Sequence, residues 1–184
     1  MNTGLIPARY ATALIDFAIE SKAVEQVYAE AKAVGQSFFQ FNKLKKALDN
    51  PVLAKAEKKK IIVLAAGGEV SQPFDKFIDL LIVNEREEFL QSIMLKYIDL
   101  YRKKNNIHFG KLTTASKVDA ATEKRLIAMV ESKTGGTIEM EKIINPAIVG
   151  GFTFEVDFIR WDASIARQLQ MIKNEYIEVN KSIA

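Results

Sequence analysis

The sequence predicts an α+β fold, in which a bundle of six helices precedes a small α/β domain of the order strand, helix, strand, strand, helix. Apolar residues recur at helical spacing through most of the first part of the 184-residue chain, with short breakers between the segments. After KKNN (103–106) the pattern changes to runs of β-branched and aromatic residues, which are typical of strands. We therefore expect two domains, a helical bundle over 1–105 and an α/β domain over 106–184.

Local signals bound the six helices of the first domain. The residue before a proline is pushed out of helical geometry, so DNP (49–51) ends the third helix. Gly67 and Gly68 suit the C-terminal cap of the fourth helix, and Pro73 suits the first turn of the fifth. Short connections between these segments predict a compact antiparallel bundle. The expected helices cover residues 5–20, 23–41, 43–48, 54–67, 73–83 and 86–104.

The second domain is expected to begin with a strand at 107–116. Asp119 is a good N-cap for the helix that follows, which a pair of glycines ends. TIEMEKII (137–144) alternates apolar with charged residues, as a half-buried strand does. The run IVGGFTFEVDFI (148–159) continues as a third strand, and Asp162 is the expected N-cap of the final helix.

The Gly150–Gly151 pair raises the question of a phosphate-binding loop. Such a loop places several glycines before a helix N-terminus, whereas this pair precedes the strand-like FTFEV. Glycine inside a strand marks a bulge or a close backbone approach, so we interpret the pair as structural. His108 is the only histidine and cysteine is absent, so a nucleophilic triad and a transition-metal site are both unsupported. We expect no enzyme activity, no cofactor and no bound metal.

The charged runs are interpreted as local features of helices. The net charge is +3, and much of the excess lies in KAEKKK (55–60). We interpret this run as a solvated helix face, with nucleic-acid binding through Lys55 to Lys60 as the alternative. The acids in NEREE (84–88) are expected at a helix start, where they favour the helix dipole. No stretch is long enough to span a membrane, no secretion signal is recognisable, and the absence of cysteine favours a cytoplasmic protein.

Two of the expected helices carry more apolar surface than a bundle helix needs, which is about 100° of its circumference. Residues 5–20 have one narrow polar stripe, and residues 73–83 have another, formed by Asp75, Lys76 and Asp79. Either both are core helices, or they leave a groove that accepts an amphipathic helix of another protein. The face that such a helix would cover comprises Ile6, Tyr10, Ala13, Phe17 and, opposite them, Leu80.

The last helix carries a narrow apolar seam. Its members recur at steps of four, three, four, three and four, and they are Ile165, Leu169, Ile172, Tyr176, Val179 and Ile183. This 3.5-residue spacing suits packing against another helix. The seam packs either on the domain's own sheet or on a helix of a partner.

Four segments follow one another in the order of a known family. ARYATAL (8–14) is similar to its opening motif, and LLIVNEREEFLQSI (80–93) to the junction of its fifth and sixth helices. INPAIVGGFTFEV (144–156) is similar to its C-terminal signature, and DASIARQL (162–169) to its closing segment. The family that the chain resembles, over nearly its whole length, is the delta subunit of F-type ATP synthases, called oligomycin-sensitivity-conferring protein (OSCP) in mitochondria.

Within these segments, several residues hold the positions of the family's signature, for which we expect a structural role. They are Asn84, Arg86, Gly150, Gly151, Asp162, Ser164 and Leu169. The departures are Asp157 and Ala163, where the family usually has glycine, and Phe154, where it usually has an aliphatic residue. Because Asp tolerates left-handed geometry in a turn, these departures concern the shape of one hairpin.

The resemblance implies a non-catalytic stator subunit of a proton- or sodium-driven ATP synthase. The bundle would bind the N-terminal helix of an alpha subunit between its first and fifth helices, and the second domain would bind the C-terminal end of the b subunits. The implied alpha contacts are Tyr10, Ala13, Leu14, Leu80 and Val83. For the b contact, the resemblance indicates only the second domain and its last helix.

A stator subunit of this kind would be peripheral to the cytoplasmic face of the inner (plasma) membrane, held there through the complex, and would bind no nucleic acid. The alternative is a helical interaction module with an unrelated partner. Co-purification with other components of the ATP synthase separates the two interpretations.

Overall fold

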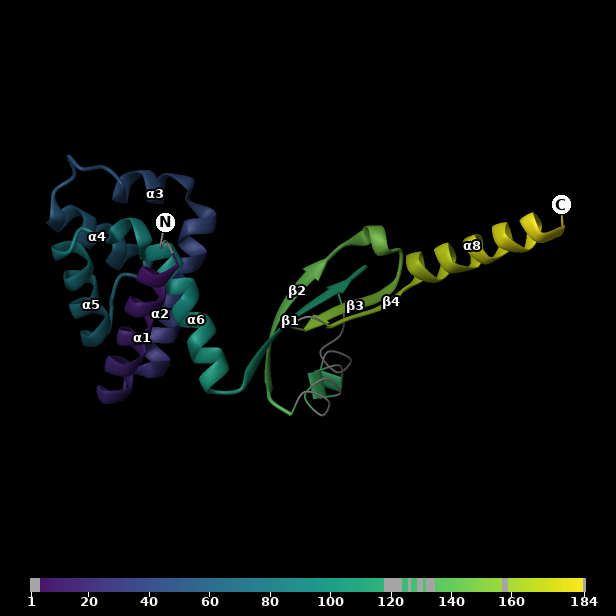
Figure 1. Cartoon of the computed structure of the whole chain (residues 1–184), viewed down its shortest axis with the longest axis horizontal. Helices are drawn as coiled ribbons and strands as arrows, with labels where there is room; N and C mark the ends of the chain where they lie inside the picture. The colour runs from purple at the N-terminus through teal and green to yellow at the C-terminus, as the bar shows by residue number, and fades with distance from the viewer. Residues whose placement is uncertain are drawn as a thin grey trace. The chain divides into compact units, whose positions relative to one another are not determined.

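The structure is a computed structural model, and it confirms the predicted α+β class. It describes residues 4–117, 124–125, 127–128, 131, 135–156 and 159–183, with the burial of side chains described as far as residue 176. The chain divides into two compact units, Met1–Lys104 and Asn105–Ala184. The first unit is helical and the second is built on a sheet (Figure 1).

Six α-helices form the first unit, as the apolar periodicity predicts. They are α1 (Leu5–Glu20), α2 (Val24–Gln40), α3 (Asn42–Leu48), α4 (Lys55–Ala65), α5 (Gln72–Val83) and α6 (Leu90–Lys104). The first five agree closely with the predicted ranges. The sixth begins later than predicted, because a 3-10 turn, η1 (Glu87–Phe89), precedes it and the backbone at Glu85 is left-handed, with φ of 55°.

Helix α6 contributes Tyr97, the largest fully buried side chain among the described residues, and it contacts both α1 and α2. Ile93, Met94 and Tyr97 on α6 are fully buried, and so are the small Ala11 of α1 and Ala31 of α2, the two helices that α6 contacts. Small side chains at such contacts let helices approach closely. The buried Tyr97 hydroxyl donates a hydrogen bond to a backbone oxygen of α2 at 3.4 Å, and burial raises the pKa of Tyr97.

The second unit contains a four-stranded mixed sheet in the order β2-β1-β3-β4. Its elements are β1 (Ile107–Thr114), β2 (Thr137–Ile144), the 3-10 turn η2 (Pro146–Ile148), β3 (Gly151–Val156), β4 (Ile159–Ser164) and α8 (Ile165–Ile183). Strands β1 and β2 are parallel, and the other two pairs are antiparallel. The helix predicted after β1 lies largely outside the described residues, and its predicted cap, Asp119, lies wholly outside them.

Strand β4 corrects the prediction for the end of this unit. Asp162 was expected to begin the final helix, but it lies in β4, opposite Thr153 of β3, and α8 begins at Ile165. The single expected strand over 148–159 therefore ends earlier, and a hairpin follows. Asp157, the expected turn residue, lies outside the described residues.

One face of the sheet carries the core of the second unit, and the other face carries charges. The core comprises Leu112, Ile138, Phe154 and Val156, with Met140, Phe152 and Trp161 packed against it. On the opposite face, Glu141, Lys111, Glu155 and Arg160 stand in register across all four strands, so opposite charges alternate. Nowhere in the described part of the chain is a helix long and apolar enough to cross a membrane.

Candidate functional site

Helices α1 and α5 lie side by side in the bundle (Figure 1), and aromatic rings join them. The ring of Tyr10 meets that of Phe77 edge to face, with the ring centroids 6.4 Å apart and the planes at 74°. The Lys76 ammonium lies over the ring of Phe17, 5.9 Å from its centroid. Both arrangements are favourable, because each places positive charge against an aromatic π face.

The outer side of this helix pair is an exposed apolar surface, here called the α1–α5 face. It comprises Ile6, Tyr10, Ala13 and Phe17 of α1 with Leu80 and Val83 of α5. Leu80 and Val83 are 48% and 69% exposed, and Tyr10 and Phe17 are half-buried. Apolar side chains gathered on two neighbouring helices are typical of a surface that binds another protein.

Leu14, the remaining residue of the implied alpha-contact set, is 1% exposed and belongs to the bundle core. Successive residues of a helix are turned by about 100°, so Leu14 points inward while Ala13 next to it stays exposed. The interpretation of α1 and α5 as core helices thus holds for one side of each, and the binding of a partner helix on the other side stays a prediction. Each helix buries one side in the core and presents further apolar residues outside it.

The acids of α5 are engaged on the side of α4. The Lys59 Nζ of α4 lies 2.9 Å from Asp75 Oδ1 and 2.8 Å from Asp79 Oδ1. These hydrogen bonds, first that with Asp79 and then that with Asp75, raise the pKa of Lys59. Both acids thus pair with α4, and Lys76 is the cation of α5 that lies beside the α1–α5 face.

Two residues of the family signature shape the turn that ends α5. The Asn84 side-chain amide donates to the backbone oxygen of Leu80 at 2.8 Å, and the backbone N–H of Arg86 donates to the oxygen of Leu81 at 3.0 Å. These bonds close the last turn of α5 beside the exposed Val83. Together they form the C-terminal cap of α5.

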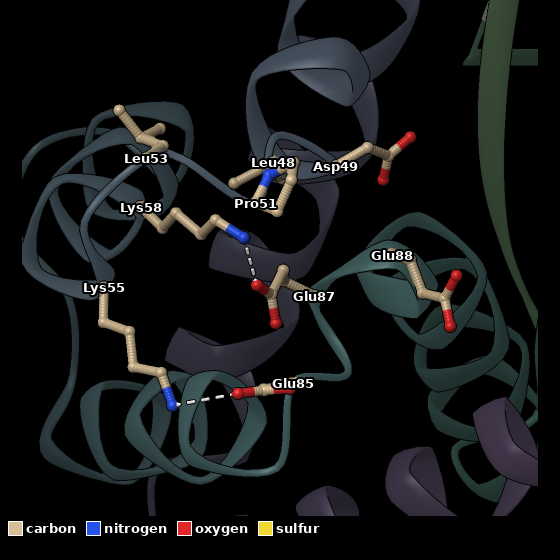
Figure 2. Close-up of a pocket in the computed structure, with 9 residues that line it drawn as sticks. All are labelled: Leu48, Asp49, Pro51, Leu53, Lys55, Lys58, Glu85, Glu87 and Glu88. Carbon is tan, nitrogen blue, oxygen red and sulfur yellow. Dashed lines mark hydrogen bonds and ion pairs between the residues drawn. The ribbon is translucent and has the colours of Figure 1, made fainter.

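A cavity of about 420 Å³ lies where the end of α3, the start of α4 and the turn after α5 meet (Figure 2). Lys58 Nζ donates to Glu87 Oε1 there, and the two residues are 7% and 9% exposed. Glu87 Oε2 is buried and has no hydrogen-bond partner among the described residues. Lys55 pairs with Glu85 at 3.5 Å, whereas Glu88 points away from both pairs (Figure 2). In the described ranges, no group of three or more His, Cys, Asp or Glu residues is arranged to hold a metal ion.

The buried pair of Lys58 and Glu87 corrects the interpretation of the charged runs KAEKKK (55–60) and NEREE (84–88). KAEKKK is not wholly solvated, because Lys58 shares a helix face with Ile62, four residues on and fully buried. The four-residue spacing between Lys58 and Ile62 is the feature of the sequence from which the burial of Lys58 could have been predicted. Within NEREE, Glu87 pairs with Lys58 across the fold and lies in a 3-10 turn, so it is not simply an acid at the start of a helix.

The same ion pairs argue against the alternative that Lys55 to Lys60 bind a nucleic acid. Every lysine of the run 55–60 has a carboxylate partner, in the pairs Lys55–Glu85, Lys58–Glu87, Lys59–Asp75, Lys59–Asp79 and Lys60–Glu57. A patch that binds phosphates needs cations whose charge is not already neutralised by neighbouring acids. The lysines of this run are thus engaged in ion pairs within the bundle.

At the start of α8, Ser164 is the N-cap, two residues after the predicted Asp162. Its Oγ accepts from the N–H of Arg167 at 3.2 Å, as an N-cap side chain does. Asp162 Oδ1 accepts from the hydroxyl and the N–H of Ser164, at 2.6 and 3.1 Å, and thereby holds the cap in place. These hydrogen bonds, that from the Ser164 side chain first, lower the pKa of Asp162.

The glycine pair fits the close junction between η2, β3 and α8. Gly151 has a φ of 73°, and a Cβ there would lie 2.1 Å from the backbone oxygen of Ala163. A Cβ on Gly150 would lie 2.6 Å from Cδ1 of Ile165, and Gly150 accepts a hydrogen bond from the N–H of that residue at 3.0 Å. The pair therefore permits a close backbone approach.

The apolar seam of α8 is exposed where it is described. Ile165, Leu169, Ile172 and Tyr176 are 42%, 56%, 63% and 70% exposed, so exposure rises along the helix. The sheet of the second unit therefore leaves most of this part of the seam uncovered. The side chains of Val179 and Ile183 lie outside the described residues.

Comparison with known proteins identifies the class to which this chain belongs. Residues 6–175 match the family model described as ATP synthase delta (OSCP) subunit. The chain is 43% identical over 184 residues to ATP synthase subunit delta of Phocaeicola vulgatus and 40% identical over 185 residues to that of Bacteroides fragilis, with full coverage of both chains in each case. A chain in a solved structure of the Toxoplasma gondii mitochondrial ATP synthase hexamer has a similar fold, with a TM-score of 0.66 at 18% identity and 93% and 97% coverage.

The chain belongs to the ATP synthase delta (OSCP) subunit family. It is a non-catalytic subunit of the F-type ATP synthase and a component of its peripheral stalk.

Proposed function

We propose that the two units of this chain bind different parts of the ATP synthase and so link the catalytic head to the stalk. The first unit binds the N-terminal helix of an alpha subunit on the α1–α5 face. The second binds the C-terminal end of the b subunits, with the exposed seam of α8 as its contact. The link prevents the head from turning with the rotor, so that torque drives ATP synthesis.

One observation supports the contact with the alpha subunit: Leu80 and Val83 are exposed beside the half-buried Tyr10 and Phe17. An amphipathic helix seated there would remove these side chains from water. Each large apolar side chain that becomes fully buried contributes roughly 1.5–3 kcal/mol before the costs of association are subtracted. Leu14 supports the face from within the core and makes no direct contact in this proposal.

A location in the cell follows from the proposed contacts. Held through its partners, it lies at the cytoplasmic face of the inner (plasma) membrane, in a complex driven by protons or sodium ions. The family membership supports this location, and the sequence carries no motif that selects the coupling ion.

Calorimetric titration of the chain with a synthetic peptide of the alpha subunit's N-terminus from the same organism tests the alpha contact. We expect one-to-one binding, weakened at least about tenfold by Leu80→Asp, because a carboxylate on a buried apolar contact must be desolvated. Leu64→Asp on α4 is the matched control, since Leu64 is 72% exposed and lies outside the α1–α5 face. Equal affinity of wild type and Leu80→Asp would contradict the assignment of the face.

A further inference from the structure

A cation lies over an aromatic ring of the α1–α5 face. Lys76 lies on α5, one turn before Leu80 and two turns before Val83, so these three side chains form one stripe. Its ammonium lies over the ring of Phe17, 5.9 Å from the centroid. The stripe therefore begins with a positive charge and continues with apolar residues.

Lys76 forms no ion pair with the described residues of the bundle, and its ammonium contacts the Phe17 ring. The neighbouring acids of α5, Asp75 and Asp79, are engaged by Lys59 of α4. No carboxylate of the described residues lies within ion-pair distance of the Lys76 ammonium, and this includes the exposed Asp16 and Glu20 of α1. The Phe17 ring supplies an electrostatic attraction that is weaker than a paired carboxylate would give in a desolvated site.

A helix that covers this face changes the surroundings of Lys76. As it seats on Tyr10 and Leu80, it also covers the stem of Lys76 and withdraws water from the ammonium. Removing water from a charge is unfavourable unless a partner of opposite sign takes the water's place. A helix with an apolar or basic residue at that point is therefore disfavoured, and one with a carboxylate is favoured.

We infer that Lys76 determines the specificity of the α1–α5 face by selecting an amphipathic helix with an acidic residue next to its apolar anchors, on the side that faces α5. This inference rests on the proposed function, because it assumes that a helix binds there. The exposed polar stripe of α1 carries charges of both signs, Arg9 with Asp16 and Glu20, so the edge of the face on α5 is the one that selects by charge. The pairing fixes the register of the bound helix as well as its identity.

A charge-reversal experiment tests the inference. The probe is the synthetic alpha N-terminal peptide, and each of its acidic residues is changed to Lys in turn. Binding to the wild-type chain and to Lys76→Glu is measured by calorimetry at low salt. Lys46→Glu on α3 is the matched control, since Lys46 is exposed and lies on neither α1 nor α5. Far-UV circular dichroism of each variant checks that the bundle is folded.

Lys76→Glu is expected to lower the affinity about tenfold, the effect of a partly desolvated charge pair, and Lys46→Glu to leave it unchanged. One altered peptide is expected to bind Lys76→Glu more tightly than the original peptide does, while it binds the wild type more weakly. Lys76→Met, which keeps most of the stem, should lose the salt dependence that the wild type shows.

Three results would overturn the inference, and they are distinguishable. Binding of the original peptide equally to wild type and Lys76→Glu would remove the role of Lys76 and leave the proposed face intact. Weakening by Lys76→Glu that no altered peptide restores would show that the charge acts without a carboxylate partner. Absence of binding to the wild type would contradict the proposed function itself.

Discussion

The buried ion pair between Lys58 and Glu87 provides a sharp test of how the bundle is held together. It joins α4 to the 3-10 turn after α5, and its side chains are 9% and 10% exposed. Lys58→Met removes the cation and leaves the Glu87 carboxylate buried without a partner. Breaking a buried pair in this way costs about 3–5 kcal/mol, because the remaining charge has lost its compensation. For a bundle of this size, that loss lowers the melting temperature by about 12 °C or more.

The double variant Lys58→Met with Glu87→Leu distinguishes a lost charge partner from lost packing. Because both charges are then replaced by apolar groups, its free energy of unfolding is expected to lie within about 1 kcal/mol of the wild type. Lys60→Met is the matched control, since Lys60 pairs with Glu57 at the surface and exposed pairs contribute less than about 1 kcal/mol.

Urea denaturation followed by far-UV circular dichroism measures the stability of the helical unit. Trp161, the only tryptophan, lies in the second unit, and its fluorescence provides an internal control that should not change. A loss below about 1 kcal/mol for Lys58→Met would refute the reasoning, because the pair would then be screened by water in spite of its burial.

Three further predictions concern the second unit. Gly151→Ala is expected to destabilise this unit by about 2 kcal/mol or more, because φ is 73° and a Cβ would meet the backbone oxygen of Ala163 at 2.1 Å; unchanged unfolding by Trp161 fluorescence would contradict this. The pKa of Asp162 is lowered by folding, so its contribution to stability is present above its usual pKa near 3.8 and is lost as the pH falls through the lower folded value. Asp162→Asn should therefore flatten the acid limb of the stability profile, and an unaltered limb would argue against this role. Leu169→Asp should leave the unit folded, because that side chain is 56% exposed, and should weaken binding of a peptide from the C-terminus of the b chain; undiminished binding would exclude the α8 seam as the contact.

The helices of the bundle were predictable because each depends on local signals. Apolar spacing gives the buried face of a helix, and DNP at 49–51, Gly67 and Pro73 mark ends that the structure places close by. The start of α6 was not predictable in the same way. Its first predicted turn became 3-10 where Glu87 turns toward Lys58, a partner 29 residues away in the sequence.

Strand β4 was missed for a related reason. Asp162 followed by Ser164 before an apolar run has the composition of a helix start, and Ser164 does cap α8. What the local pattern could not convey is that residues 159–164 pair with β3, which adds the packing of Trp161 on Phe154 at 5.9 Å between ring centroids. Tertiary pairing therefore decided the conformation of this segment.

For the candidate site, the sequence placed most of the face correctly on two helices, but it could not give the exposure of each residue. Ala13 and Leu14 are adjacent, yet one is exposed and the other is 1% exposed, because the helix turns about 100° between them. The role proposed for Lys76 depended on knowing that Asp75 and Asp79 are engaged by α4. Ion pairs between helices are not visible in periodicity.

Simultaneous binding tests the central claim, that the chain bridges the head and the stalk, most directly. The full chain is mixed with the isolated catalytic head and with the soluble part of the b subunits, and the masses of the complexes are measured by analytical ultracentrifugation. The account predicts a complex that contains all three components, loses only the head in Tyr10→Asp and loses only the b subunits in Leu169→Asp. Mutually exclusive binding of the two partners, or loss of both through either variant, would contradict it.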